Sequence, residues 1–160
     1  MQISSGAAVF AAAVIVSGAA AGPARAQPAI EVSPSDSRAS APASPENFTG
    51  AAYSTPLFDV TDYSDMSGGT VKFDPGARTA WHIHPAGQTL IITDGAGWVQ
   101  SWGGPKQLMA SGDVVRIPPG VKHWHGATAT DAMTHVAVAE AVDGSRVTWL
   151  EQVDELQYQN

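Results

Sequence analysis

Residues 76–88 decide the fold, and they read Gly76-Ala77-Arg78-Thr79-Ala80-Trp81-His82-Ile83-His84-Pro85-Ala86-Gly87-Gln88. His82 and His84 are two positions apart, and on an extended strand such side chains lie on the same face. Two imidazoles side by side can bind a divalent metal that prefers nitrogen ligands. Pro85 and Gly87 permit a tight bend, after which the amide oxygen of Gln88 can return to the same point.

A second stretch repeats the histidine pattern, and it reads Gly112-Asp113-Val114-Val115-Arg116-Ile117-Pro118-Pro119-Gly120-Val121-Lys122-His123-Trp124-His125-Gly126. His123 and His125 are again two positions apart. Four of the five histidines of the chain fall in these two stretches. The sequence therefore predicts a metal site inside a β-barrel.

The first 26 residues are typical of a secretory signal peptide. An apolar run rich in Ala and Val extends from Ala7 to Ala21, and Ala24-Arg25-Ala26 follows it as an A-x-A cleavage pattern. The run is shorter than the roughly 20 residues that a membrane-spanning helix needs. We expect cleavage before Gln27, export to the bacterial periplasm or medium, and no membrane span in the mature chain.

Residues 27–47 are rich in Pro, Ser and Ala, a composition that cannot bury enough apolar area to order the chain, so they are predicted to be a disordered tether. The folded domain is predicted over residues 48–160. It contains no cysteine, so barrel closure or oligomerisation must replace disulfides. We expect a homo-oligomer, because exposed edge strands gain from pairing.

The formal net charge of −7 and the lack of a basic patch exclude nucleic acid and anionic membranes as partners. Short apolar or alternating runs alternate with Gly- and Pro-rich turns, as in all-β proteins. We expect strands near residues 57–60, 69–73, 79–84, 89–92, 97–102, 107–109, 114–117, 123–127, 134–141 and 147–152. Many short strands at this spacing indicate a sandwich or a closed barrel.

Both histidine stretches resemble the two sequence motifs of the cupin family. The first motif is carried by Gly76, His82-x-His84, Gln88 and Gly95, with Gln88 where most cupins have Glu. The second is carried by Gly112, Pro118-x-Gly120 and His123, with Ala127 in place of the usual Asn. The resemblance implies a double-stranded β-helix, which is a jelly-roll barrel.

The residues inside the motifs are similar to those of one bacterial group of small single-domain cupins. The similarity runs from about Gly69 to Tyr158. The group includes manganese-dependent hydroxynitrile lyases and cupins linked to carboxymuconolactone decarboxylase. The resemblance implies a metal-dependent lyase that converts a small cyanohydrin to aldehyde plus cyanide, and the reverse. Two alternatives stay open: a non-haem iron dioxygenase, and a non-catalytic exported cupin that binds a metal or small ligand.

The predicted metal ligands are His82, His84, His123 and Gln88. Three neutral imidazoles and a neutral amide leave the full dipositive charge on the ion, which makes it a stronger Lewis acid than a site containing Glu would. Ligand type alone admits Mn, Fe, Co, Ni, Cu or Zn. The resemblance favours Mn and then Fe, with Zn, Ni and Co also compatible.

Two further histidines are candidates for catalysis. His125 shares the face of His123 one step along the strand, so we predict that it lies beside the metal and transfers a proton. The alternative is a partly buried histidine that fills the barrel mouth. His135 shares its face with Ala137 and Ala139, small residues that leave room for a substrate, and the resemblance places a pocket histidine at this position.

Arg78 is the candidate for substrate binding. It shares strand parity with His82, so its guanidinium could enter the cavity and hold an anionic group. It could equally form an ion pair at the rim of the barrel, and the sequence leaves both roles open.

Overall fold

The computed structural model describes residue 27 and residues 29–160. The predicted signal peptide, residues 1–26, lies outside the described residues and stays a prediction. The chain divides into two compact units between Val32 and Ser33, and the fold is that of the second unit, Ser33–Asn160. Among the described residues, no helix combines the length and hydropathy needed to cross a bilayer.

The second unit is built from short strands, as predicted for an all-β fold. The strands are β1 (Ala41–Pro42), β2 (Phe48–Thr49), β3 (Ala52–Phe58), β4 (Met66–Phe73), β5 (Arg78–Thr79), β6 (His82–Ile83), β7 (Gln88–Ser101), β8 (Gln107–Ala110), β9 (Val114–Ile117), β10 (His123–Ala127), β11 (Met133–Glu140) and β12 (Thr148–Trp149). The helices are η1 (Ser35–Ser37) and α1 (Glu155–Gln159).

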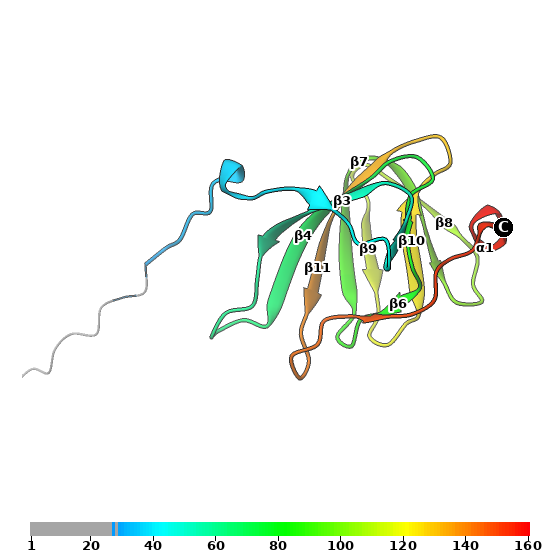
Figure 1. Ribbon diagram of the computed structural model, residues 1–160. Helices are drawn as coiled ribbons and strands as arrows, with labels where there is room; N and C mark the ends of the chain where they lie inside the picture. The colour runs from blue at the N-terminus through cyan, green and yellow to red at the C-terminus, as the bar shows by residue number, and fades with distance from the viewer. Residues whose placement is uncertain (1–26, 28) are drawn as a thin grey trace, which may run out of the picture. The chain divides into compact units, whose positions relative to one another are not determined.

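All strand pairs between these elements are antiparallel, and they run in the order β1-β3-β4-β11-β7-β10-β5-β2. β8 and β9 pair with β7, while β6 lies between β10 and β12. The sheet curls so that β4 and β11 lie on one side and β8 and β10 on the other, forming a half-barrel (Figure 1). This confirms the predicted fold class.

β7 corrects one detail of the prediction. Two separate strands were expected at residues 89–92 and 97–102, but β7 runs unbroken from Gln88 to Ser101. Its first half pairs with β11 and its second half with β10. Gly95 has a φ of +71°, a conformation that glycine adopts without steric cost. The glycine therefore bends one long strand from one side of the curled sheet to the other.

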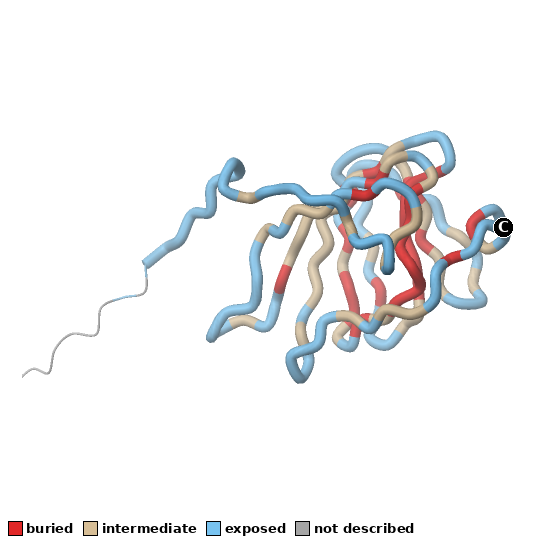
Figure 2. The backbone as a smooth tube through the Cα atoms, in the orientation of Figure 1, coloured by how far each residue is buried: buried red, intermediate tan, exposed pale blue. Residues whose placement is uncertain are grey.

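Two clusters of buried side chains stabilise the unit. The larger lies within the curled sheet and includes Phe73, Leu90 and Met133. The smaller contains Trp81, Trp124, Val153 and Tyr158. Figure 2 shows that buried residues concentrate on the strands at the centre of the sheet, and β10 is buried along its whole length. Since apolar burial is the main stabilising contribution, these strands form the most stable part of the unit.

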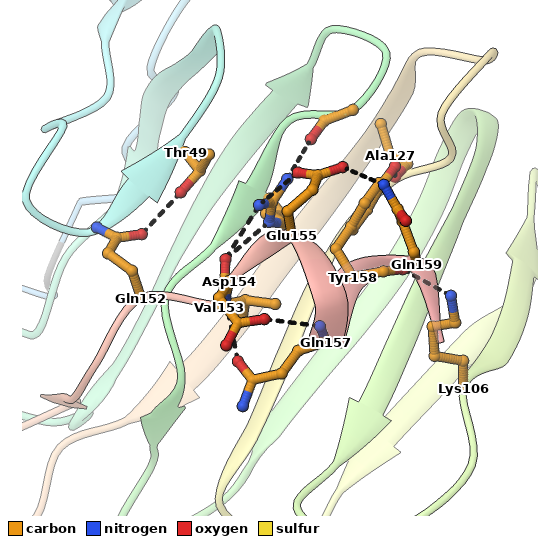
Figure 3. Close-up of polar contacts among 12 residues, drawn as sticks. Thr49, Lys106, Ala127, Gln152, Val153, Asp154, Glu155, Gln157, Tyr158 and Gln159 are labelled. Carbon is orange, nitrogen blue, oxygen red and sulfur yellow. Dashed lines mark hydrogen bonds and ion pairs between the residues drawn. The ribbon is translucent and has the colours of Figure 1, made fainter.

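Part of the segment predicted to be a tether contacts the sheet. β1 pairs with β3, and the side-chain amide of Gln152 donates to the carbonyl oxygens of Pro45 and Glu46 at 3.2 and 2.7 Å. The Thr49 hydroxyl donates to the same amide at 2.9 Å (Figure 3). The domain boundary at residue 48 stays a prediction, and Pro42, Ala43, Ser44 and Asn47 form part of one wall of the site described next.

Candidate metal centre and active site

The strand ladder places His82 beside His123. β6 pairs with β10 through the register His82 to His123, and it pairs with β12 through His82 to Trp149. The ring centroids of His82 and His123 are 4.1 Å apart. Two histidines 41 positions apart in the sequence are thus held in contact by backbone pairing.

The bend after His84 brings in the remaining predicted ligands. The carbonyl oxygen of His84 accepts the backbone N–H of Gly87 at 3.2 Å and that of Gly120 at 3.0 Å, which joins the two motifs. A Cβ on Gly87 would lie 2.6 Å from the Ile117 oxygen, so only glycine allows this approach. The joined turns leave the Gln88 amide oxygen 3.2 Å from Nε2 of His123.

Each of the three predicted histidine ligands is oriented by a backbone carbonyl at its Nδ1. The distances are 2.9 Å from His82 to Ala80, 2.6 Å from His84 to Arg146 and 2.9 Å from His123 to Val121. An Nδ1 that faces a carbonyl oxygen carries the hydrogen and donates it, which leaves Nε2 as a lone-pair donor. This is the arrangement that fixes the tautomer of metal-ligating histidines.

Unpartnered buried nitrogens support a metal. Among the described residues, Nε2 of His84, Nε2 of His125 and Nδ1 of His135 are buried without a hydrogen-bond partner. Buried polar atoms without partners are rare and need an explanation. Nε2 of His84 is a free lone-pair donor in the cavity, and so is Nε2 of His125 when the hydrogen shared with His135 lies on Nδ1 of His125. Such nitrogens fit a transition metal.

Two overlapping sets of histidines could hold the ion. His82, His123 and His125 have ligand atoms within 4.8 Å of one another. His84 is not in this set, but its ring centroid lies 5.2 Å from that of His82 and 5.8 Å from that of His123, no farther than the centroid of His125 lies from the same two rings. His125 differs from the other three because its Nδ1 faces Nε2 of His135 at 3.3 Å instead of a carbonyl. The ligand set predicted from the sequence stays a prediction.

Burial lowers the pKa of every histidine in the site. Desolvation is the largest cause in each case, and it lowers the pKa of His82 and His125 well below the ordinary value of 6.5. The pKa values of His123 and His135 fall to about 4, and that of His84 is also lowered. All five imidazoles are therefore neutral near pH 7, the state in which they can ligate a metal or accept a proton.

While His123 lines a different pocket with Val99 and Met109, the other four of the five histidines line a cavity of about 420 Å³. His82, His84, His125, His135 and Gln88 all line it, so the structure brings these predicted site residues together. Its other walls come from residues 42–48, from β3, β4 and β11, and from residues 147–149. The volume suits a small organic molecule.

The structure places Arg78 in the second of its two expected roles. Its guanidinium donates to the Val153 carbonyl at 3.1 and 3.0 Å and forms an ion pair with Glu155 at 3.3 Å. It also lies over the Tyr158 ring, 4.5 Å from the centroid. Arg78 therefore holds the C-terminal segment against β5. Its guanidinium is paired with Glu155 and Val153 and does not line the cavity.

Two aromatic residues of the cavity were not identified from the sequence. Phe48 and Trp149 both line it. The sequence alone indicates only that Phe48 begins the domain and that Trp149 lies on a strand. Their place in the site depends on the pairing of β2 with β5 and of β12 with β6. A local sequence pattern does not predict such long-range contacts.

Comparisons with known proteins agree with this geometry. Residues 69–139 match the Cupin domain. An (R)-mandelonitrile lyase of Granulicella tundricola is 49% identical over 129 residues, which cover 81% of this chain and 98% of the relative. Both histidine motifs lie inside residues 69–139.

Solved structures share the fold. A cupin-like protein of Thermotoga maritima superposes with a TM-score of 0.69 at 40% identity, over 74% of this chain and 90% of that one. A cupin 2 conserved barrel domain protein of Rhodopseudomonas palustris has a TM-score of 0.60 at 22% identity, over 70% and 77% of the two chains.

Proposed function

Because this chain belongs to the cupin family, as a small single-domain cupin, we propose that it is a metal-dependent lyase that cleaves mandelonitrile-type cyanohydrins to aldehyde and cyanide and catalyses the reverse addition. The observation that carries the proposal is the unpartnered, buried Nε2 of His125, which belongs to a residue that lines the same cavity as the carbonyl-anchored His82 and His84. The identity to a mandelonitrile lyase over 98% of that relative supports the choice of substrate.

The metal is proposed to be held by Nε2 of His82, His84 and His123 together with the amide oxygen of Gln88, with Mn preferred and Fe next. These three histidines share the Nδ1–carbonyl anchor that presents Nε2 to an ion. When bound, the metal supplies positive charge that stabilises negative charge developing on the substrate. All four proposed ligands are neutral, so none of that charge is cancelled.

His125 is proposed to move the proton. Its neutral Nε2 accepts the hydroxyl proton of the cyanohydrin while the bond between the carbinol carbon and the cyano carbon breaks, and cyanide leaves with the bonding electron pair. The aldehyde forms, and the protonated imidazole returns the proton to cyanide as HCN. Because burial lowers the pKa of His125, the imidazolium releases this proton readily.

His135 is proposed to position His125. Its Nε2 faces Nδ1 of His125 at 3.3 Å, and the two rings are edge to face with centroids 4.9 Å apart. A hydrogen shared between these nitrogens fixes which nitrogen of His125 faces the substrate. The Phe73 ring packs against His135, 5.4 Å between centroids, and limits its movement.

The test is the cleavage of the two mandelonitrile enantiomers by protein reconstituted separately with Mn and with Fe. We expect benzaldehyde and cyanide in equal amounts, more rapidly from one enantiomer, and loss of the activity after chelation of the metal. Oxygen uptake in the same assay measures the dioxygenase alternative. Metal-loaded protein that releases no benzaldehyde from either enantiomer would contradict the proposed function.

A further inference from the structure

Two aromatic residues, Phe48 and Trp149, share the cavity with the two candidate catalytic histidines. Phe48 lies on β2 and Trp149 on β12, and both line the cavity together with His125 and His135. Positions 48 and 149 lie outside the residues that match the Cupin domain, 69–139. The matched segment thus contributes all the histidines, while its two flanks contribute the aromatic wall.

The two rings form a continuous aromatic surface beside the proposed metal ligands. Their centroids are 5.7 Å apart at an interplanar angle of 54°, and the Trp149 ring lies 4.8 Å from the ring of His82. Both side chains are only half-buried, so each keeps ring surface accessible. Aromatic pairs favour tilted or offset contacts with centroids about 4.5–7 Å apart, and a third ring placed here can adopt such contacts.

One side chain ties the two flanks together. Gln152, three residues after Trp149, donates to the Pro45 and Glu46 carbonyls and accepts from Thr49, next to Phe48. Figure 3 shows the contact between Gln152 and Thr49. The spacing of the two rings is therefore set by hydrogen bonds between the flanks, so the aromatic surface is preorganised before a ligand arrives.

We propose that Phe48 and Trp149 form the subsite for the aryl group of the substrate and determine its preference over aliphatic substrates. The proposal rests on the proposed function for the identity of the reacting group. An aryl ring placed on this surface lies in the same cavity as His82 and His125, and next to His82 because the Trp149 ring lies 4.8 Å from it. An alkyl substituent lacks the flat face and the quadrupole that favour contact with two aromatic rings.

The experiment compares the Mn-loaded wild type with Phe48→Leu, Trp149→Leu and the control Trp102→Leu. Trp102 is 55% exposed and lines a separate groove with Trp81 and Leu156. The measured quantity is kcat/KM for mandelonitrile divided by kcat/KM for 2-hydroxybutyronitrile. We expect this ratio to fall about tenfold in each cavity variant, as for lost apolar pocket contacts, and to stay unchanged in the control. Metal content checks that the site is intact.

A second measurement separates this proposal from the proposed function. Binding of benzaldehyde and of butanal to the metal-loaded proteins is followed by saturation-transfer NMR, which needs no turnover. Preferential benzaldehyde binding that Phe48→Leu abolishes, in a protein without lyase activity, would support the subsite and overturn the lyase function. Lyase activity with an unchanged substrate ratio in both cavity variants would overturn the subsite alone. Neither activity nor preferential binding would overturn both.

Discussion

At the scale of single residues, the site contains two kinds of histidine, which differ in the hydrogen-bond partner of Nδ1. His82, His84 and His123 are fixed at Nδ1 by backbone carbonyls, which cannot exchange a proton. His125 is held at Nδ1 by another imidazole, which can. The first kind suits a metal ligand and the second a proton-transferring group, although the rings of His123 and His125 lie only 5.9 Å apart.

Replacement of His125 by Ala tests this division. We expect kcat for mandelonitrile cleavage to fall by about 10²–10⁴-fold, the usual contribution of a positioned acid or base, while the metal content stays at the wild-type level. His135→Ala should lower kcat less and leave the metal in place. Loss of the metal from His125→Ala protein would instead assign His125 to the ligand set with His82 and His123.

Replacement of Gln88 by Glu tests the role of the neutral amide. The carboxylate should bind the metal more tightly, because it adds a negative charge to the ligand set, and should lower kcat because it cancels part of the ion's positive charge. The measurements are the rate of metal loss to EDTA and the steady-state kinetics. Faster metal loss from the variant, or an increase in kcat, would contradict this account.

At the scale of elements, the strand β7 joins both sides of the curled sheet, and its bend at Gly95 makes that possible. A Cβ on Gly95 would lie 1.8 Å from the Ala132 carbonyl oxygen, so the strand approaches the start of β11 too closely for a side chain. The register between β11 and β7 also shifts between Thr134 and His135, which sets the face on which His135 lies.

Gly95→Ala is expected to destabilise the protein by more than the strain of its positive φ alone. Gly103 offers a matched control, because its φ of +74° is nearly the same but a Cβ there meets nothing within 4 Å. Gly103→Ala should cost about 1 kcal/mol in the free energy of unfolding and Gly95→Ala about 3 kcal/mol or more. Urea unfolding of the metal-free proteins measures the difference. Equal losses would show that the bend tolerates a side chain.

The elements also show where sequence reasoning works. Strands such as β9 and β10 were predicted at their observed bounds, because a short apolar run between Gly- and Pro-rich turns is a local pattern. The sequence predicts two strands, 89–92 and 97–102, where the structure has the single strand β7, because a local pattern cannot distinguish a hairpin from a bend in a continuous strand. The His-x-His spacing predicts that the histidines lie close together, and four of them line one cavity. The positions of Arg78, Phe48 and Trp149 depend on partners more than 60 residues distant in the sequence or on cross-strand register.

At the scale of the whole molecule, burial of five neutral histidines makes stability depend on pH. Above pH 6.5 the histidines are unprotonated in both the folded and the unfolded protein. As the pH falls from 6.5 to about 4, the unfolded chain binds protons that buried groups such as His135 do not. The folded state of the metal-free protein is therefore destabilised across this window.

We expect the free energy of unfolding of the metal-free protein to be several kcal/mol lower near pH 4.5 than at pH 7.5, since a shift of this size is worth about 3 kcal/mol for one histidine. Urea unfolding in the presence of EDTA measures it. His135→Gln protein should show a smaller pH dependence, because it lacks one of the shifted groups. A pH-independent unfolding energy between 7.5 and 4.5 would contradict the burial of neutral imidazoles.

The joined histidine motifs are proposed to hold one transition metal. The most direct test is elemental mass spectrometry of untagged protein, reconstituted with Mn or Fe and then desalted, beside His84→Ala protein treated identically. We predict one equivalent of metal in the wild type and a loss of most of it in the variant, since Nε2 of His84 is buried without a partner among the described residues. A wild type that retains no metal after reconstitution would contradict the metal centre and the lyase mechanism built on it.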